Sequence, residues 1–294
     1  MIVAVATAGE PVRLRVMPLG ELLDESFKLY RRHFTVIAGV ALVIILPGLI
    51  LSLLSGSFRA NPISYLTSLL QNANNPDELA RLQARQQQYT SSPLYLLTFP
   101  VAALLFPFSY GAIYRAATSL AAGNLETVGS VLMGTLRRYF AIWGVVLLTF
   151  CVAIGFIGIV TIPVVIWVLI RWSVAMPALF AEGIGPVKAL GRSWNLVRDN
   201  WWRTLGILFI VSIMLGLIQT ALAALFGGVT AVIPGLSDDI RAGLLTTVTT
   251  IVDALVGAIQ PIAITMLYLD LRVRKEGLDL DQLARQAAPP AAPA

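Results

Sequence analysis

Six long apolar stretches constrain this chain more than any other feature of its sequence. They lie at about residues 34–54, 94–117, 140–160, 163–182, 204–226 and 243–269. A helix needs about 20 mostly apolar residues to cross the hydrocarbon core of a bilayer. Each stretch is long enough for one crossing. We therefore expect an all-α polytopic membrane protein with six transmembrane helices.

The composition agrees with a protein whose solvent is largely lipid. Of the 294 residues, 57% are hydrophobic and only 13% are charged, and the mean hydropathy is +0.79. Ordinary globular chains have about 25% charged residues, and one water-soluble core could not bury so much apolar surface. The composition excludes a disordered chain, a disulfide scaffold and an ordinary cytosolic enzyme.

The distribution of Lys and Arg predicts how the spans are oriented. With a cytoplasmic N-terminus, the cytoplasmic segments hold 16 of the 21 Lys and Arg residues, the outer segments hold 4, and Arg171 lies within the fourth span. Cytoplasmic loops of membrane proteins carry the excess of positive charge. We expect a multi-pass protein of the cell (inner) membrane with both termini cytoplasmic. Because Arg13 and Arg15 follow the short N-terminal apolar run, we expect no signal peptide and a retained first span.

Three amphipathic segments precede the first, third and fifth spans. Their apolar faces are, in turn, Leu23, Phe27, Tyr30 and Phe34; Val128, Leu132, Leu136 and Phe140; and Val187, Leu190, Trp194 and Val197. Apolar residues at this spacing share one face of a helix. We expect three helices in the cytoplasmic interface that anchor the spans, with docking of a partner as the alternative.

The loop between the first two spans, about residues 55–93, predicts a short helical structure on the outer face. Asn is a favoured N-cap and Pro a favoured first helical residue, and Asn-Pro occurs at 61–62 and at 75–76. We expect helices over about 62–73 and 76–89. We also expect a tight outer hairpin at about 156–163, one membrane domain over 1–286, and a disordered Ala/Pro tail over 287–294.

Residues that could carry out chemistry are scarce. Cys151 is the one cysteine and His33 the one histidine. One His cannot supply the usual zinc ligand pairs, and no phosphate-binding Gly-rich motif occurs. We therefore expect no catalytic residue, no metal and no cofactor. The net charge of +5 lies along the predicted cytoplasmic segments, which favours a membrane surface over nucleic acid.

Four polar residues fall inside the predicted spans: Arg171, Asp253, Gln219 and Gln260. Charged groups at membrane depth are costly and usually face the interior of a helix bundle or water. Two interpretations are open. In the first, Arg171 and Asp253 gate a polar pathway. In the second, their role is structural: both residues lock helices together, or Asp253 simply faces the water on the outer side.

A second set of candidates lies at the predicted cytoplasmic interface. These basic and aromatic residues would contact anionic lipid headgroups or a membrane protein partner: Arg31, Arg32, Arg137, Arg138, Arg192, Trp194, Trp201 and Trp202. Aromatic side chains favour the headgroup zone, and Lys and Arg meet anionic lipid there.

Three stretches together resemble one family: LGELLDESFKLYRRHF, PALFAEGIGPVKALGRSWNLVRDNWWR and YLDLRVRKEGLDLDQLA. The resemblance, over about residues 17–285, is to bacterial six-helix membrane proteins often labelled the membrane domain of glycerophosphoryl diester phosphodiesterases. In the enzymes of that name, a separate soluble barrel with two His and metal-binding carboxylates carries catalysis. The resemblance therefore implies a membrane part without that activity, and it transfers no catalytic residue. It also implies a bacterial inner membrane and a cytoplasmic position for Glu182, Arg192, Ser193 and Trp194.

These features favour a non-enzymatic integral membrane protein that organises the membrane or serves as a partner-binding subunit. The alternative is a transporter or channel with a polar pathway near Arg171 and Asp253. An intramembrane enzyme is disfavoured, because no nucleophile–base pair or metal set is present.

Overall fold

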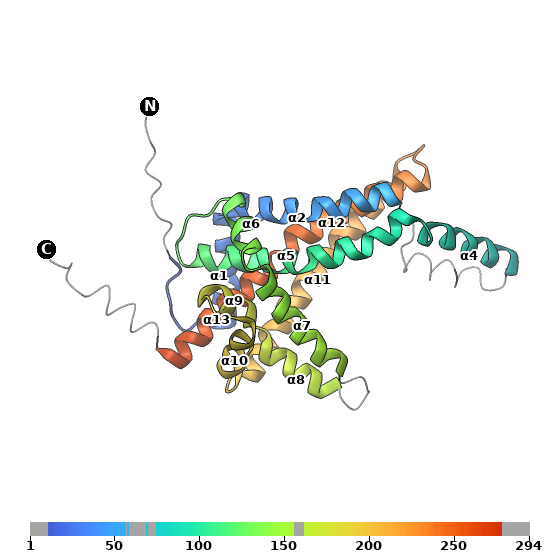
Figure 1. The fold of residues 1–294 in the computed structure, drawn as a ribbon. Helices are drawn as coiled ribbons and strands as arrows, with labels where there is room; N and C mark the ends of the chain where they lie inside the picture. The colour runs from blue at the N-terminus through green and yellow to red at the C-terminus, as the bar shows by residue number, and fades with distance from the viewer. Residues whose placement is uncertain (1–10, 57, 59–68, 70–74, 156–161, 278–294) are drawn as a thin grey trace. The chain divides into compact units, whose positions relative to one another are not determined.

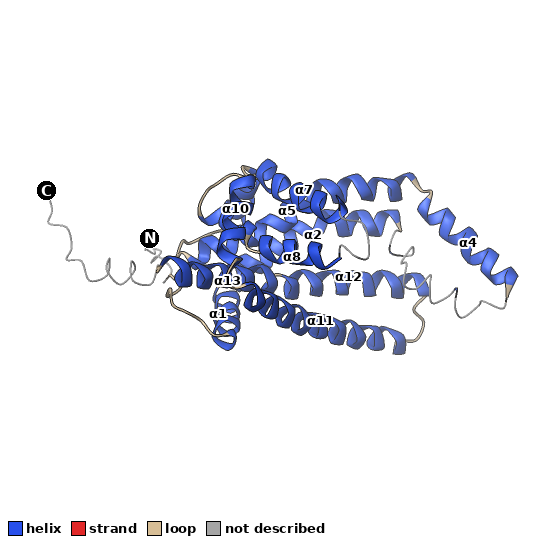
Figure 2. Cartoon of the chain, turned by 90° about the horizontal axis from the view of Figure 1, so that it is seen from below, coloured by secondary structure: helices blue, strands red, loops and turns tan. Residues whose placement is uncertain are grey.

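The computed structural model describes residues 11–56, 58, 69, 75–155 and 162–277, and every regular element among them is an α-helix (Figures 1 and 2). In chain order these helices are α1 (Leu19–Arg32), α2 (Phe34–Ser55), α4 (Pro76–Thr90), α5 (Pro93–Ala121), α6 (Val128–Leu136), α7 (Tyr139–Gly155), α8 (Ile162–Trp172), α9 (Ala175–Ala181), α10 (Pro186–Val197), α11 (Trp201–Val232), α12 (Asp238–Gly257) and α13 (Ile259–Glu276).

Five segments are long and apolar enough to cross a membrane. They are Phe34–Ser55, Pro93–Ala121, Ile162–Ala181, Trp201–Val232 and Ile240–Glu276. A sixth is added if α6 and the first part of α7, which meet at an angle of 65°, form one broken span. An all-helical membrane protein is therefore confirmed, with five or six candidate spans.

The spans differ from the predicted ones mainly at their ends and breaks. The stretch predicted as one span over 163–182 consists of α8 and α9, separated by a turn at Ser173 and Val174. The last span was expected to end near residue 269, but α13 continues to Glu276. Asp270, the first charged residue after the predicted span, lies within α13 and is paired inside the protein.

The fold contains two compact units that share continuous helices. Unit 1 comprises Met1–Val40, Tyr110–Leu215 and Ala258–Ala294, and unit 2 comprises Ala41–Ser109 and Gly216–Gly257. The boundary between the units cuts through α2, α5 and α11. Each of these helices therefore contributes to both units. The expected single domain over 1–286 stays a prediction.

In unit 1, α1 packs on α13 through a face next to the predicted one. Leu22, Ser26 and Leu29 are buried, at the spacing that places residues on one side of a helix. The predicted apolar residues of α1, such as Phe27 and Tyr30, lie on the neighbouring side and are half-buried, and Phe34, the first residue of α2, is exposed. One face of α1 therefore packs against the protein, and the neighbouring apolar face remains partly exposed.

The other two predicted amphipathic segments are also helices. In α6, Val131 and Thr135 are buried, whereas Phe140, beyond its end, is 86% exposed. In contrast, α10 packs against α7, α8, α9 and α13 and buries Leu190 and Val197 of its predicted face. Protein rather than lipid therefore covers much of α10.

Unit 2 contains α4, α12 and the remaining parts of three long helices. The Asn75 side chain caps α4 by accepting a hydrogen bond of 3.3 Å from the Glu78 N–H, with Pro76 at the first helical position. The helix predicted over 76–89 and its cap are confirmed. Parts of the helix predicted over 62–73, the hairpin at 156–161 and the predicted disordered tail lie outside the described residues.

Candidate functional site

Arg171 lies at the C-terminal end of α8, between two tryptophan rings. Its guanidinium carbon is 4.6 Å from the ring centroid of Trp167 and 4.6 Å from that of Trp194. The two rings meet edge to face, 5.0 Å apart. Because Trp167 belongs to α8 and Trp194 to α10, cation–π contacts with Arg171 join the two helices.

A buried serine fixes the backbone beside Arg171. The Ser193 hydroxyl donates to the Arg171 carbonyl oxygen at 2.7 Å and accepts from the Val174 N–H at 3.2 Å. The serine thereby satisfies backbone groups that the turn between α8 and α9 leaves without helical partners. This contact explains why the predicted span breaks at that point.

Next to Arg171, a cavity of about 620 Å³ runs along α8 and reaches the start of α11. Its lining includes Trp167, Arg171, Arg198, Trp201, Trp202 and Arg203. The Trp201 indole N–H donates to the Trp167 carbonyl oxygen at 3.2 Å, which ties the start of α11 to α8. The lining therefore combines guanidinium groups with indole rings.

Two of the charges at this cavity are neutralised by partners. Asp199 forms an ion pair of 2.9 Å with Lys275, and this hydrogen-bonded lysine lowers the pKa of Asp199 below its usual value, with smaller effects from Arg198 and Arg171. Arg203 pairs with Asp270 at 3.0 Å. Among the described residues, Arg171 and Arg198 have no carboxylate at ion-pair distance.

Asp270 is fully buried and joins three parts of unit 1. Its carboxylate accepts a hydrogen bond of 2.7 Å from the Met17 N–H and pairs with Arg203 of α11 and Arg274 of α13. Arg203 also donates to the Met17 carbonyl oxygen. A buried carboxylate is tolerated only with such pairing, so Asp270 fixes the chain before α1 against α11 and α13.

Glu182 forms a second charged junction. One of its oxygens accepts from Arg192 at 2.7 Å and from the Tyr268 hydroxyl at 2.7 Å. Arg192 also pairs with Glu276, which Arg272 contacts at 3.0 Å. The network links α10 to the end of α13.

Arg138 stabilises the turn after α9. Its guanidinium donates to the carbonyl oxygens of Leu179, Gly183 and Ile184 at 2.9–3.2 Å. Gly183 has φ +69°, a conformation that glycine adopts without the steric cost of a side chain. Arg138 is therefore occupied by protein carbonyls.

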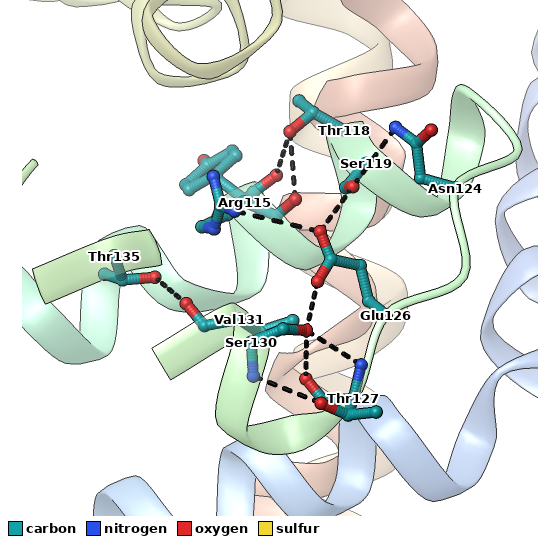
Figure 3. Close-up of polar contacts among 10 residues, drawn as sticks. Arg115, Thr118, Ser119, Asn124, Glu126, Thr127, Ser130, Val131 and Thr135 are labelled. Atoms are coloured by element: carbon teal, nitrogen blue, oxygen red, sulfur yellow. Dashed lines mark hydrogen bonds and ion pairs between the residues drawn. The ribbon is translucent and has the colours of Figure 1, made fainter. Parts of the chain in front are cut away.

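A polar cluster at the start of α6 lines another cavity of unit 1, of about 540 Å³ (Figure 3). Glu126 accepts from Ser119 at 2.7 Å and from Ser130, and it lies 3.8 Å from Arg115. Thr127 and Ser130 form a reciprocal capping box at the start of α6. The cluster fixes the loop between α5 and α6.

The structure separates the predicted interfacial residues into two classes. Arg31, Arg32, Arg137 and Trp202 are exposed, and the exposed fraction of Trp202 is 79%. Arg138, Arg192, Trp194 and Trp201 contact other parts of the protein, as described above. The first class is exposed at the surface, whereas the second class is engaged in contacts within the protein.

The four predicted intramembrane polar residues are divided between the two units. Arg171 and Gln260 belong to unit 1, and Gln219 and Asp253 to unit 2. Asp253 and Gln260 are exposed, and a side chain added at Gly257 would meet the Gln219 amide nitrogen at 3.8 Å. A polar pathway through these residues stays a prediction.

The sequence interpretation missed Asp270, Tyr268, Arg198 and Trp167. The available signal was weak but real: a carboxylate among several arginines near the end of an apolar span has to be paired, exposed or protonated. What the sequence could not supply is the partner, because Met17 lies 253 positions from Asp270.

Residues 142–288, half of the chain, match the model of a family described as "Membrane domain of glycerophosphoryl diester phosphodiesterase". The matched stretch begins in α7 and includes Arg171, Glu182, Arg198 and Asp270. No curated protein and no solved structure shows significant similarity to the chain.

Proposed function

The chain belongs to the family of the membrane domain of glycerophosphoryl diester phosphodiesterase, and from that premise we propose a non-enzymatic role in organising anionic lipid. The site of this role would be the cytoplasmic face of the cell membrane. The family describes a membrane domain, and the candidate spans make this chain an integral membrane protein.

The observation that carries the proposal is the exposure of the apolar helices. In the apolar windows of the five candidate spans, only 11–39% of the residues are buried within the protein. Water would oppose so large an exposed apolar surface, whereas lipid tails solvate it. The remaining area is therefore the surface that would contact lipid.

The charge distribution supports a cytoplasmic position for the cationic segments. With the N-terminus and C-terminus on that side, and the broken pair α6–α7 counted as a span, six spans place 16 Lys and Arg residues there. Exposed Arg31 and Arg137 would meet anionic headgroups, and exposed Trp202 and Phe140 would lie at the level of the headgroups.

The test is to extract the full chain from native membranes with its surrounding lipid, using a styrene–maleic acid copolymer, and to identify the lipids and proteins that accompany it. We expect enrichment of anionic phospholipid over the bulk membrane. A bulk lipid composition together with a stoichiometric protein would contradict lipid organisation and favour a partner-binding subunit. An ion flux in liposomes that Asp253→Asn abolishes would contradict it in favour of transport.

A further inference from the structure

We propose that the cavity beside Arg171 binds a phosphate ester anion, supplied by the headgroup of an anionic phospholipid. This inference rests on the proposed function, because it requires the C-terminal end of α8 and the start of α11 to lie at the headgroup level. Of the candidate span Ile162–Ala181, only α8 would then lie in the hydrocarbon, and α9, beyond the turn at Ser173 and Val174, would lie on the cytoplasmic side. It goes further by assigning one site, one ligand chemistry and the side chains that would bind it.

The arginines at the cavity differ in whether a carboxylate pairs with them. Asp199 is paired with Lys275 and Arg203 with Asp270, so these four groups largely neutralise one another. Arg171 and Arg198 line the same cavity and form no ion pair with any described carboxylate. Guanidinium groups bind phosphate oxygens through two parallel hydrogen bonds, and the carboxylate that acts on both arginines at longer range, Asp199, is itself paired with Lys275.

Arg171 is held in place before a ligand arrives. The indole rings of Trp167 and Trp194, each 4.6 Å away, fix the plane of its guanidinium. The Nε atom of Arg171 is buried and has no hydrogen-bond partner in the described part of the chain. Nε itself is closed off from the cavity, so an anion there would meet the terminal N–H groups of this guanidinium, which the two rings already hold in place; little side-chain entropy would then be lost on binding.

The start of α11 borders the same cavity. The Thr204 N–H donates to the Asn200 carbonyl oxygen at 2.9 Å, so α11 leaves the N–H groups of its first residues without partners from its own helix. Such helix ends favour anions. The residues concerned, Trp201 and Trp202, are also lining residues.

The apolar part of the lining favours a lipid over a free phosphate as the source. Pro163, Trp201 and Trp202 border the cavity, and Ile166 of α8 is 44% exposed. Pro163 lies eight residues from Arg171, about 12 Å along a helix, so a phosphate at Arg171 leaves room along α8 for a glycerol backbone and the beginning of acyl chains. Indole rings favour this boundary between polar and apolar zones.

The test titrates the purified full chain in mild detergent with phosphatidylglycerol or phosphatidylcholine and counts bound lipids by native mass spectrometry. We expect the wild type to prefer the anionic lipid by about tenfold. Arg198→Gln should remove most of this preference, because the exposed Arg198 contributes charge and not packing. Arg171→Gln should do the same if it folds. The matched control, Arg85→Gln, alters an exposed arginine of α4 that does not line the cavity and should change the preference less than twofold.

A second arm distinguishes the two sources of phosphate. Millimolar inorganic phosphate or glycerol 3-phosphate should not displace the bound lipid, whereas displacement at such concentrations would overturn a lipid source. An unchanged preference in Arg198→Gln would overturn the site itself while leaving the proposed lipid enrichment intact. In contrast, bulk lipid composition around the extracted wild type would count against the proposed function.

Discussion

Met17 and Asp270 are 253 positions apart, yet the Met17 N–H donates a 2.7 Å hydrogen bond to the buried carboxylate of Asp270. Arg203 contacts both the Met17 carbonyl oxygen and the Asp270 carboxylate. The fully buried carboxylate of Asp270 therefore fixes the segment before α1 to the start of α11 and to the C-terminal part of α13. This junction determines where α1 packs on α13.

Asp270→Ala should be strongly destabilising. The substitution leaves the guanidinium groups of Arg203 and Arg274 without their carboxylate, and removing one partner of a buried pair costs about 3–5 kcal/mol. We expect the midpoint of thermal unfolding in detergent, measured by size-exclusion with fluorescence detection, to fall by about 5 °C or more. The matched control is Asp199→Ala at an exposed ion pair with Lys275, which should change the midpoint little; equal effects would contradict the account of Asp270.

Gly144→Ala should destabilise the packing of α7 on α10. A Cβ atom at Gly144 would lie 2.7 Å from Cγ and 2.8 Å from Cβ of the rigid Pro186 ring. Overpacking of this kind costs about 1–3 kcal/mol. Gly206→Ala in α11, where a Cβ meets nothing within 4 Å, is the control and should be neutral or slightly stabilising. If both variants unfold at the same temperature, the close approach of α7 and α10 is wrong.

Thr127→Ala should weaken the start of α6. The Thr127 hydroxyl accepts from the Ser130 N–H at 3.2 Å in the capping box (Figure 3), and loss of such a cap costs about 1 kcal/mol. Hydrogen exchange of the first turn of α6 should accelerate about fivefold. The nearby Thr118→Ala removes a hydroxyl that donates to the Tyr114 carbonyl of its own helix, and it should leave exchange in α6 unchanged.

His33 should titrate below the usual pKa of a histidine. Partial burial, with a smaller effect from the charge of Arg32, lowers the pKa of His33 below 6.5. Its contribution to stability is therefore complete above pH 6.5 and is lost as the pH falls through the lower pKa of the folded protein. Because His33 is the one histidine of the chain, a single ¹³C-histidine NMR titration measures it; a pKa above 6.5 would contradict this environment. His33→Gln should remove the corresponding fall in thermal stability between pH 7 and 5.5.

The sequence predicted the elements that follow from length and local chemistry. Bilayer thickness determines the length of an apolar span, which is why Phe34–Ser55 and Ile162–Ala181 were found within one residue of their ends. The helices that contain the last two spans, Trp201–Val232 and Ile240–Glu276, extend six and seven residues beyond the predicted C-terminal ends. The Asn75-Pro76 pair predicted the start of α4, because an N-cap side chain bonds to a backbone N–H only three residues further along the chain.

The contacts between helices could not be predicted in this way. Apolar residues that face lipid and those that face protein look alike in sequence, so the packing of α10 against four helices was missed. The turn at Val174 depends on Ser193, which lies 19 positions away. Likewise, Asp270 is buried within α13 with Arg203 and Met17, both far away in the sequence, among its partners.

The most direct test of the account is the sidedness of its cationic segments. Single cysteines are introduced by Arg137→Cys, Val187→Cys and Gln83→Cys into a Cys151→Ser background and labelled with a membrane-impermeant maleimide in intact bacterial cells. All three positions are exposed in the structure. The account predicts labelling at position 83 in intact cells, and labelling at 137 and 187 only after the membrane is permeabilised. Labelling of 137 and 187 from opposite sides, or of 83 from the same side as both, would contradict it.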